Sequence, residues 1–103
     1  MILEVAPLTI KTGQCPAFEA AFAQAEPIIA SMPGYLGHEL QRCLEDQQRY
    51  VLLVRWNTLE DHTVGFRGSE RYQEWKQLLH HFYDPFPVVE HFERVSLTPP
   101  NVG

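Results

Sequence analysis

The segment from Tyr50 to Val54 constrains the fold more than any other, because its five residues are all apolar and Arg55 and Trp56 follow directly. Side chains alternate between the two faces of a strand, so this strand is apolar on both faces and needs cover on both. In a chain of 103 residues, one layer of helices can cover one face. We expect a second copy of the same sheet to cover the other face, in a homodimer.

Length and composition narrow the class of protein. A chain of this size corresponds to one domain, which we expect to span residues 1–97, with a flexible tail at 98–103 that contains two prolines. The formal charge is −5, and no basic cluster favours a nucleic acid or an anionic membrane as partner. The sequence has neither a basic leader nor an apolar run long enough to span a membrane, which predicts a cytoplasmic protein. Cys15 and Cys43 are expected to be free thiols.

Hydrophobic periodicity predicts the element order β-α-β-β-α-β, with one additional short helix. The expected segments are a strand at 2–10, a helix from residue 15, a hairpin of strands at 35–44 and 50–56, a short helix ending at 67, a helix through 81 and a strand at 88–97. This order is the ferredoxin-like split βαβ motif, an α+β fold in which a four-stranded antiparallel sheet carries its helices on one face. The bare face is the one that we expect to pack against a partner.

Several residues mark the expected ends of the helices. Pro27 removes a hydrogen bond inside the first helix and predicts a kink or an early end there. Asn57 and Glu60 have the spacing of a capping box at the start of the short helix. Gly68 ends that helix, and Ser69 can cap the next one.

Three short motifs, taken in order, resemble the antibiotic biosynthesis monooxygenase domain family. They are Pro33-Gly34-Tyr35-Leu36-Gly37 before the second strand, Val54-Arg55-Trp56 at the end of the third, and the helix Ser69-x-x-Tyr72-x-x-Trp75. The resemblance covers residues 1–97. It implies a dimeric α+β barrel with one ligand cavity per subunit, between sheet and helices. The activities it implies are cofactor-free oxidation of quinols or aromatic polyketides, or degradation of haem.

Two positions depart from the pattern of that family. Oxygenase and haem-degrading members place an Asn on the first strand beside the Trp that matches Trp56, whereas Ala6 stands there in this chain. Lys76 stands where the haem-degrading branch has its iron-ligating His, and an ammonium group is a poor iron ligand. No glycine-rich loop that could hold a flavin phosphate occurs either. We therefore expect no haem, flavin or other cofactor.

His62 is the candidate catalytic residue. Many members of the family carry a His in the helix after the Trp, although at the commonest placement this chain has Gly65. A neutral imidazole can accept the hydroxyl proton of a phenol or quinol, and deprotonation makes the ring reactive toward dioxygen. The alternative is a partly exposed His that hydrogen-bonds to the backbone.

Other residues are candidates for ligand binding. Four aromatic residues either line a pocket or form the core: Trp56, Phe66, Tyr72 and Trp75. Arg67 can meet an anionic oxygen of a substrate or make a salt bridge. His38, on the leucine face of its strand, is expected to face either the cavity or the dimer seam.

Two histidine-containing segments have residue types that bind metals, His80-His81-x-x-Asp84 and Glu90-His91. Neighbouring side chains on a helix diverge by about 100°, so His80 and His81 do not easily bind the same ion. We expect no metal site.

Together these features predict a cofactor-independent monooxygenase that acts on a quinol or related aromatic molecule, with His62 as its base. The alternative is a non-oxidative binding protein or isomerase-like enzyme for a small metabolite, which Ala6 in place of Asn favours. A module that serves only dimerisation is a third possibility.

Overall fold

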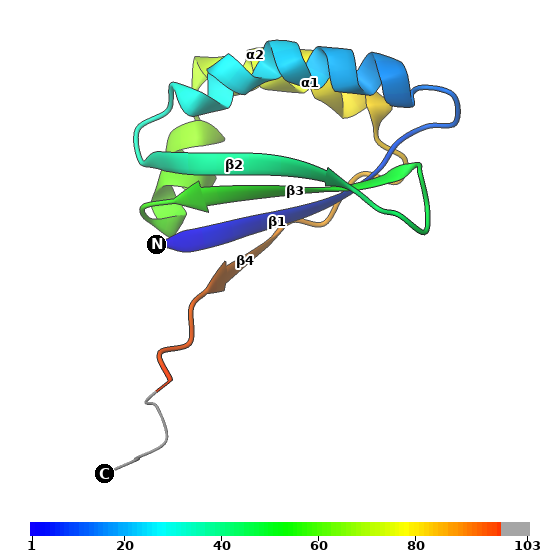
Figure 1. Cartoon of the computed structure of the whole chain (residues 1–103). Helices are drawn as coiled ribbons and strands as arrows, with labels where there is room; N and C mark the ends of the chain where they lie inside the picture. The colour runs from blue at the N-terminus through cyan, green and yellow to red at the C-terminus, as the bar shows by residue number, and fades with distance from the viewer. Residues whose placement is uncertain (98–103) are drawn as a thin grey trace.

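The computed structural model describes residues 1–97 and contains a four-stranded antiparallel sheet in the order β2-β3-β1-β4 (Figure 1). The strands are β1 (Ile2–Thr9), β2 (Tyr35–Arg42), β3 (Arg49–Trp56) and β4 (Glu90–Glu93). Helices α1 (Cys15–Ala30) and α2 (Glu70–Leu79) lie against each other on one face of the sheet. The short helices η1 (Asp61–Phe66) and η2 (His80–Phe82) flank α2 in sequence. The predicted ferredoxin-like order is confirmed, and the tail expected at 98–103 lies outside the described residues.

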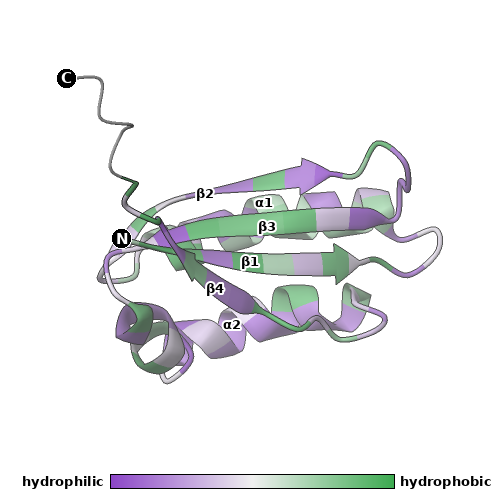
Figure 2. Ribbon diagram, turned by 90° about the horizontal axis from the view of Figure 1, so that it is seen from below, coloured by the Kyte–Doolittle hydropathy of each residue, from purple (hydrophilic) through white to green (hydrophobic). Residues whose placement is uncertain are grey.

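Alternation along the central strands separates the two faces of the sheet. In β3, Leu52, Val54 and Trp56 are buried beneath the helices, whereas Val51 and Leu53 point to the other face and are half-buried. The same alternation buries every second residue from Glu4 in β1 to Ile10, which directly follows the strand. Figure 2 views the sheet from the side that the helices leave open.

Helix α1 packs on the sheet through the predicted apolar stripe. Its buried residues are Phe18, Phe22, Ala25, Ile28 and Ile29. The early end expected at Pro27 is wrong, because the helix continues to Ala30. Pro27 lies in the last turn, where one hydrogen bond is lost, and burial of the two isoleucines that follow stabilises that turn.

The capping hydrogen bonds between β3 and η1 lie one residue later in the sequence than expected. The backbone N–H of Thr58 donates to Asp61 Oδ2 (3.0 Å), and the N–H of Asp61 donates to Thr58 Oγ1 (3.2 Å). This reciprocal pair replaces the predicted box of Asn57 and Glu60. Gly34 packs against it with φ of +82°, and a Cβ there would lie 2.1 Å from Asp61 Oδ2. A glycine is therefore required at this position.

The predicted start of α2 is confirmed, whereas the predicted length of β4 is wrong. Ser69 caps α2 as predicted, since its Oγ accepts the backbone N–H of Tyr72 (3.1 Å). The last strand is much shorter than the expected 88–97. It pairs only with β1, and Glu93 lies opposite Ile2, where β1 begins, so the ladder has no further partner. Within residues 1–97, no helix is long and apolar enough to cross a membrane.

Candidate active site

A cavity of about 440 Å³ lies between the sheet and the helices. Ala6 and Leu8 of β1 form its floor, and its aromatic walls include Phe66 of η1 and Trp75 of α2. Tyr83 and neighbouring residues of the segment after α2 complete its lining. A cavity of this size that combines aromatic walls with convergent polar groups is typical of a small-molecule site.

Glu4 is the most deeply buried acidic group of this cavity. Because Glu4 lies on the same face of β1 as Ala6 and Leu8, its carboxyl points inward, and only 6% of the residue is exposed. The indole Nε1–H of Trp56 donates to Glu4 Oε1 (2.9 Å). Burial raises the pKa of Glu4 to about 7, while the Trp56 hydrogen bond and the positive charge of Arg67 act in the opposite direction. A carboxyl with this pKa is suited to exchange protons near neutral pH.

His62 lies beside Glu4 and is 3% exposed. Its ring stacks on Trp56, with centroids 5.4 Å apart. Nδ1 lies 2.7 Å from His91 Nε2, and Nε2 lies 3.4 Å from Glu4 Oε1. Burial and the nearby charges of Arg67 and His91 lower the pKa of His62 to about 3, so its ring is neutral at pH 7. It is therefore not the partly exposed, backbone-bonded residue that was the alternative.

Of the other predicted site residues, four line the cavity, Trp56 lies behind its wall and His38 lies elsewhere. Phe66, Tyr72, Trp75 and Arg67 line the cavity with His62. Trp56 is fully buried behind the cavity wall and reaches the site through Glu4 and His62.

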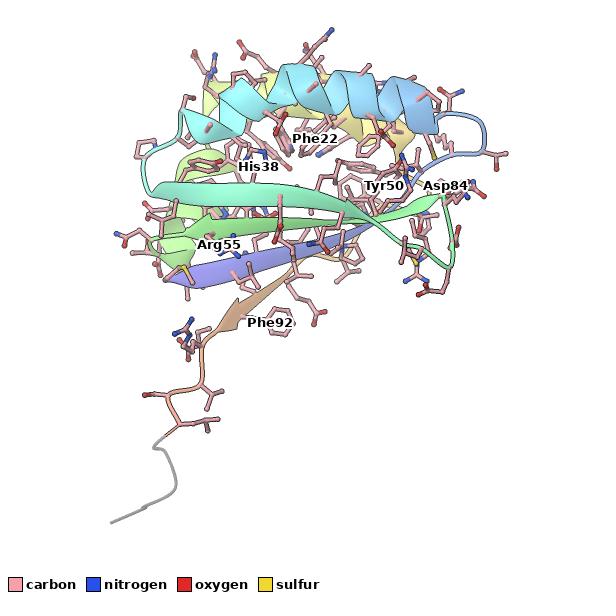
Figure 3. All side chains as sticks on the ribbon, in the orientation of Figure 1. Phe22, His38, Tyr50, Arg55, Asp84 and Phe92 are labelled. Atoms are coloured by element: carbon pink, nitrogen blue, oxygen red, sulfur yellow. The ribbon has the colours of Figure 1, made fainter. Side chains whose placement is uncertain are left out.

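His38 lies apart from the cavity, between β2 and α1 beside Phe22 (Figure 3). Its Nδ1 is 2.5 Å from the Tyr35 hydroxyl, and its Nε2 is 2.6 Å from Glu26 Oε2. These two contacts satisfy both ring nitrogens.

Ala6 lines the cavity without a polar group, yet Trp56 does have a partner on the first strand. Glu4 precedes Ala6 by two residues and faces the same side of β1. Trp56 therefore has a polar partner on the first strand although Ala6 stands at the position of the family's Asn. The acceptor of its indole N–H is a carboxyl two residues before Ala6.

The sequence patterns did not single out Glu4, His80, Tyr83 and Phe86 as members of the cavity. The sequence could have indicated that Glu4 faces inward, because it lies an even number of residues from three apolar residues on the same face of β1. His80 was considered only as a metal ligand. Tyr83 and Phe86 follow the last helix in a segment without periodicity. Among residues 1–97, no group of three or more His, Cys, Asp or Glu side chains is arranged to hold a metal ion.

The raised pKa of Glu4 makes the free energy of unfolding depend on pH. The folded state holds this proton up to about pH 7 and the unfolded chain only up to about 4.5, so the stabilisation is complete below 4.5 and is lost as pH rises through 7. The shift corresponds to about 3 kcal/mol. We expect wild type to lose about that much free energy of unfolding between about pH 4 and about pH 8. Glu4→Gln should not lose it, because its side chain does not titrate.

Urea unfolding at the two pH values measures this difference. The lowered pKa of His62 acts in the opposite direction, since its stabilisation is lost as pH falls below 6.5, but His62 is present in both proteins and cancels on subtraction. Glu90→Gln, at an exposed glutamate of β4, is the matched control. An equal difference between Glu4→Gln and wild type at both pH values would contradict the raised pKa.

Fold and cavity together define a ferredoxin-like α+β domain with an aromatic-walled cavity between its sheet and its helices. Residues 1–78 match the family model for antibiotic biosynthesis monooxygenase (ABM). The chain belongs to this family, as its motifs predicted.

Three relatives illustrate its place in the family. YczJ of Bacillus subtilis (strain 168) is 60% identical over 95 residues, which cover 92% of this chain and all of YczJ. A Bordetella bronchiseptica structure of this family is 38% identical with a TM-score of 0.88, over 92% of this chain and 97% of that one. SnoaB, a cofactor-independent oxygenase from Streptomyces nogalater, is 20% identical with a TM-score of 0.75, over 96% of this chain and 97% of SnoaB. At that identity, the likeness to SnoaB establishes the fold alone.

Proposed function

We propose that this protein is a cofactor-independent monooxygenase that acts on a quinol or related aromatic small molecule. The observation that carries the proposal is a buried carboxyl with a pKa of about 7 inside an aromatic cavity of about 440 Å³. SnoaB, which shares the fold, is a cofactor-independent oxygenase, and this supports the class of reaction.

Glu4 is the base in this proposal. Near neutral pH a substantial fraction of the molecules carries it as a carboxylate, which accepts a hydroxyl proton from the substrate. His62 is a weak base because of its low pKa, and it assists as a neutral hydrogen-bonding group beside Glu4. In this proposal the base is Glu4 and not His62, which was expected to accept the proton.

Deprotonation is the step that the protein accelerates. A quinolate gives up electrons to dioxygen more readily than a neutral quinol does. Overall, quinol and dioxygen become hydroxyquinone and water. One oxygen atom bonds to a ring carbon in place of hydrogen, the other leaves as water with two hydrogens of the substrate, and the substrate supplies all four electrons.

The remaining lining residues bind and orient the substrate. Phe66 and Trp75 offer aromatic surfaces for stacking on a planar ring. Burial raises the pKa of both Glu4 and Tyr72, and the positive charge of Arg67, which also lines the cavity, opposes both shifts. The same charge favours the anionic form of a bound quinol.

A non-oxidative enzyme or binding protein is the second candidate, and Ala6 favours it because the cavity lacks the family's amide. Glu4 could then move a proton between two positions of a metabolite without dioxygen. Dioxygen consumption with a panel of quinols separates the two candidates. Conversion of a substrate at the same rate under anaerobic conditions identifies the second.

We also propose that two copies form a homodimer through the open face of the sheet. Val51 and Leu53 lie on this face, and half of Phe92 is exposed there (Figure 3). Leu3, opposite Phe92 on β1, extends the apolar surface. A contiguous apolar surface on one side of a sheet is typical of a packing interface.

A further inference from the structure

We propose that His62 and His91 form a proton relay that connects the enclosed carboxyl of Glu4 with solvent. This inference rests on the proposed role of Glu4 as a base. Its test uses proton exchange in the resting protein, so its failure is distinguishable from failure of the proposed reaction.

The three groups form a continuous chain from the cavity to the edge of the sheet. Glu4 Oε1 lies 3.4 Å from His62 Nε2, and His62 Nδ1 lies 2.7 Å from His91 Nε2. The first separation is a few tenths of an ångström longer than an ordinary hydrogen bond, which a small rotation of the carboxyl can close. His91 lies on the edge strand β4, directly opposite Glu4 in the register with β1.

The two inner groups of this chain are buried and only the outer one reaches the surface, as a relay to solvent requires. Glu4 and His62 are 6% and 3% exposed, whereas His91 is only partly buried. A ligand in the cavity displaces water from Glu4, and the two imidazoles then offer the proton a path that does not pass the ligand. Both ring nitrogens of His62 face titratable side chains rather than backbone groups.

The transfer needs no charged imidazole before or after it. The protonated Glu4 donates to His62 Nε2, the Nδ1–H of His62 donates to His91 Nε2, and the Nδ1–H of His91 donates to water. One proton leaves and both rings exchange tautomers. The reverse shift carries a proton inward when water is formed and restores the tautomers, which agrees with the low pKa of His62. Arg67, Tyr72 and Tyr83 are the other titratable groups that interact with Glu4 or His62.

Carbon NMR of glutamate labelled at the carboxyl measures the relay without a substrate. The signal that disappears in Glu4→Gln is the Glu4 signal. Its chemical shift and line width are measured at a series of pH values on both sides of about pH 7. In wild type we expect one averaged signal that moves with pH. In His91→Phe and His91→Gln we expect the proton-exchange rate from the line shape to fall about tenfold or more, toward separate signals for the two protonation states.

Two features of this design separate a relay from a structural role for His91. The amide in His91→Gln can still hydrogen-bond to His62 but cannot exchange tautomers, so a structural role predicts wild-type exchange in that variant. Added imidazole should restore fast exchange in His91→Gly. His81→Phe, at an exposed histidine, is the control and should behave as wild type.

If His91→Phe does not fold, as judged by circular dichroism, His91→Gln decides the result. An averaged Glu4 signal in all folded His91 variants would overturn the relay. If Glu4→Gln keeps full turnover while the exchange rates change as expected, the relay stands and the proposed reaction fails.

Discussion

Replacing Glu4 with glutamine is expected to lower the turnover of a quinol by about a hundredfold or more, the range in which a general base contributes. Glutamine has nearly the same shape, and its amide oxygen can accept the Trp56 indole N–H that the carboxyl accepts in wild type. It cannot accept a proton from the substrate. Rates of dioxygen consumption, measured together with the thermal midpoint, test this expectation.

Glu90→Gln is the control for this comparison, because it makes the same chemical change at an exposed position of β4. It should keep wild-type turnover. A Glu4→Gln protein that turns over as fast as wild type would show that the carboxyl is not the base. A loss of turnover that only follows a loss of folded protein would assign Glu4 a structural role.

Replacing Leu53 with aspartate is expected to convert the protein from a dimer to a folded monomer. Leu53 is half-buried in one subunit, so a single chain tolerates the change, whereas at a dimer seam the substitution buries an unpaired carboxylate. Such burial costs about 3–5 kcal/mol, which raises the dissociation constant by about a thousandfold. Sedimentation equilibrium at micromolar concentration measures it.

Leu44→Asp is the matched control, because Leu44 is 90% exposed in the turn between β2 and β3. This variant should sediment with wild type. The interface proposal fails if wild type itself sediments as a monomer at micromolar concentration. It also fails if Leu53→Asp remains a dimer.

The order of elements and the faces of the central strands were predictable from the sequence because both follow from local periodicity. The run from Tyr50 to Val54 indicated a strand with two apolar faces, and Leu52 and Val54 indeed lie under the helices. Ser69 was recognisable as a cap because its role depends only on the next three residues.

The short-range errors arose where two local patterns overlap or where a distant partner decides. Asn57-x-x-Glu60 and Thr58-x-x-Asp61 are offset by one residue, and the packing of Gly34 on Asp61 favours the second. The length of β4 depends on where β1 begins, about 90 residues earlier in the chain.

The centre of the site was the least predictable part. Glu4 belongs to no motif, and only its position on the face of β1 that the helices cover makes it a buried acid. The burial of His62 depends on Trp56 and on His91, which comes 29 residues later. His38 was expected to face the cavity or the dimer seam, because strand periodicity does not reveal its partner Glu26, which lies one turn after Phe22 on α1.

Turnover of a quinol under ¹⁸O-labelled dioxygen tests the proposed monooxygenase reaction most directly. The quinols that sustain dioxygen consumption are used, and the product is analysed by mass spectrometry. The proposed reaction places one labelled oxygen atom in each product molecule and the other in water, with the rate strongly reduced in Glu4→Gln. An unlabelled product, or the same product at the same rate without dioxygen, would contradict it.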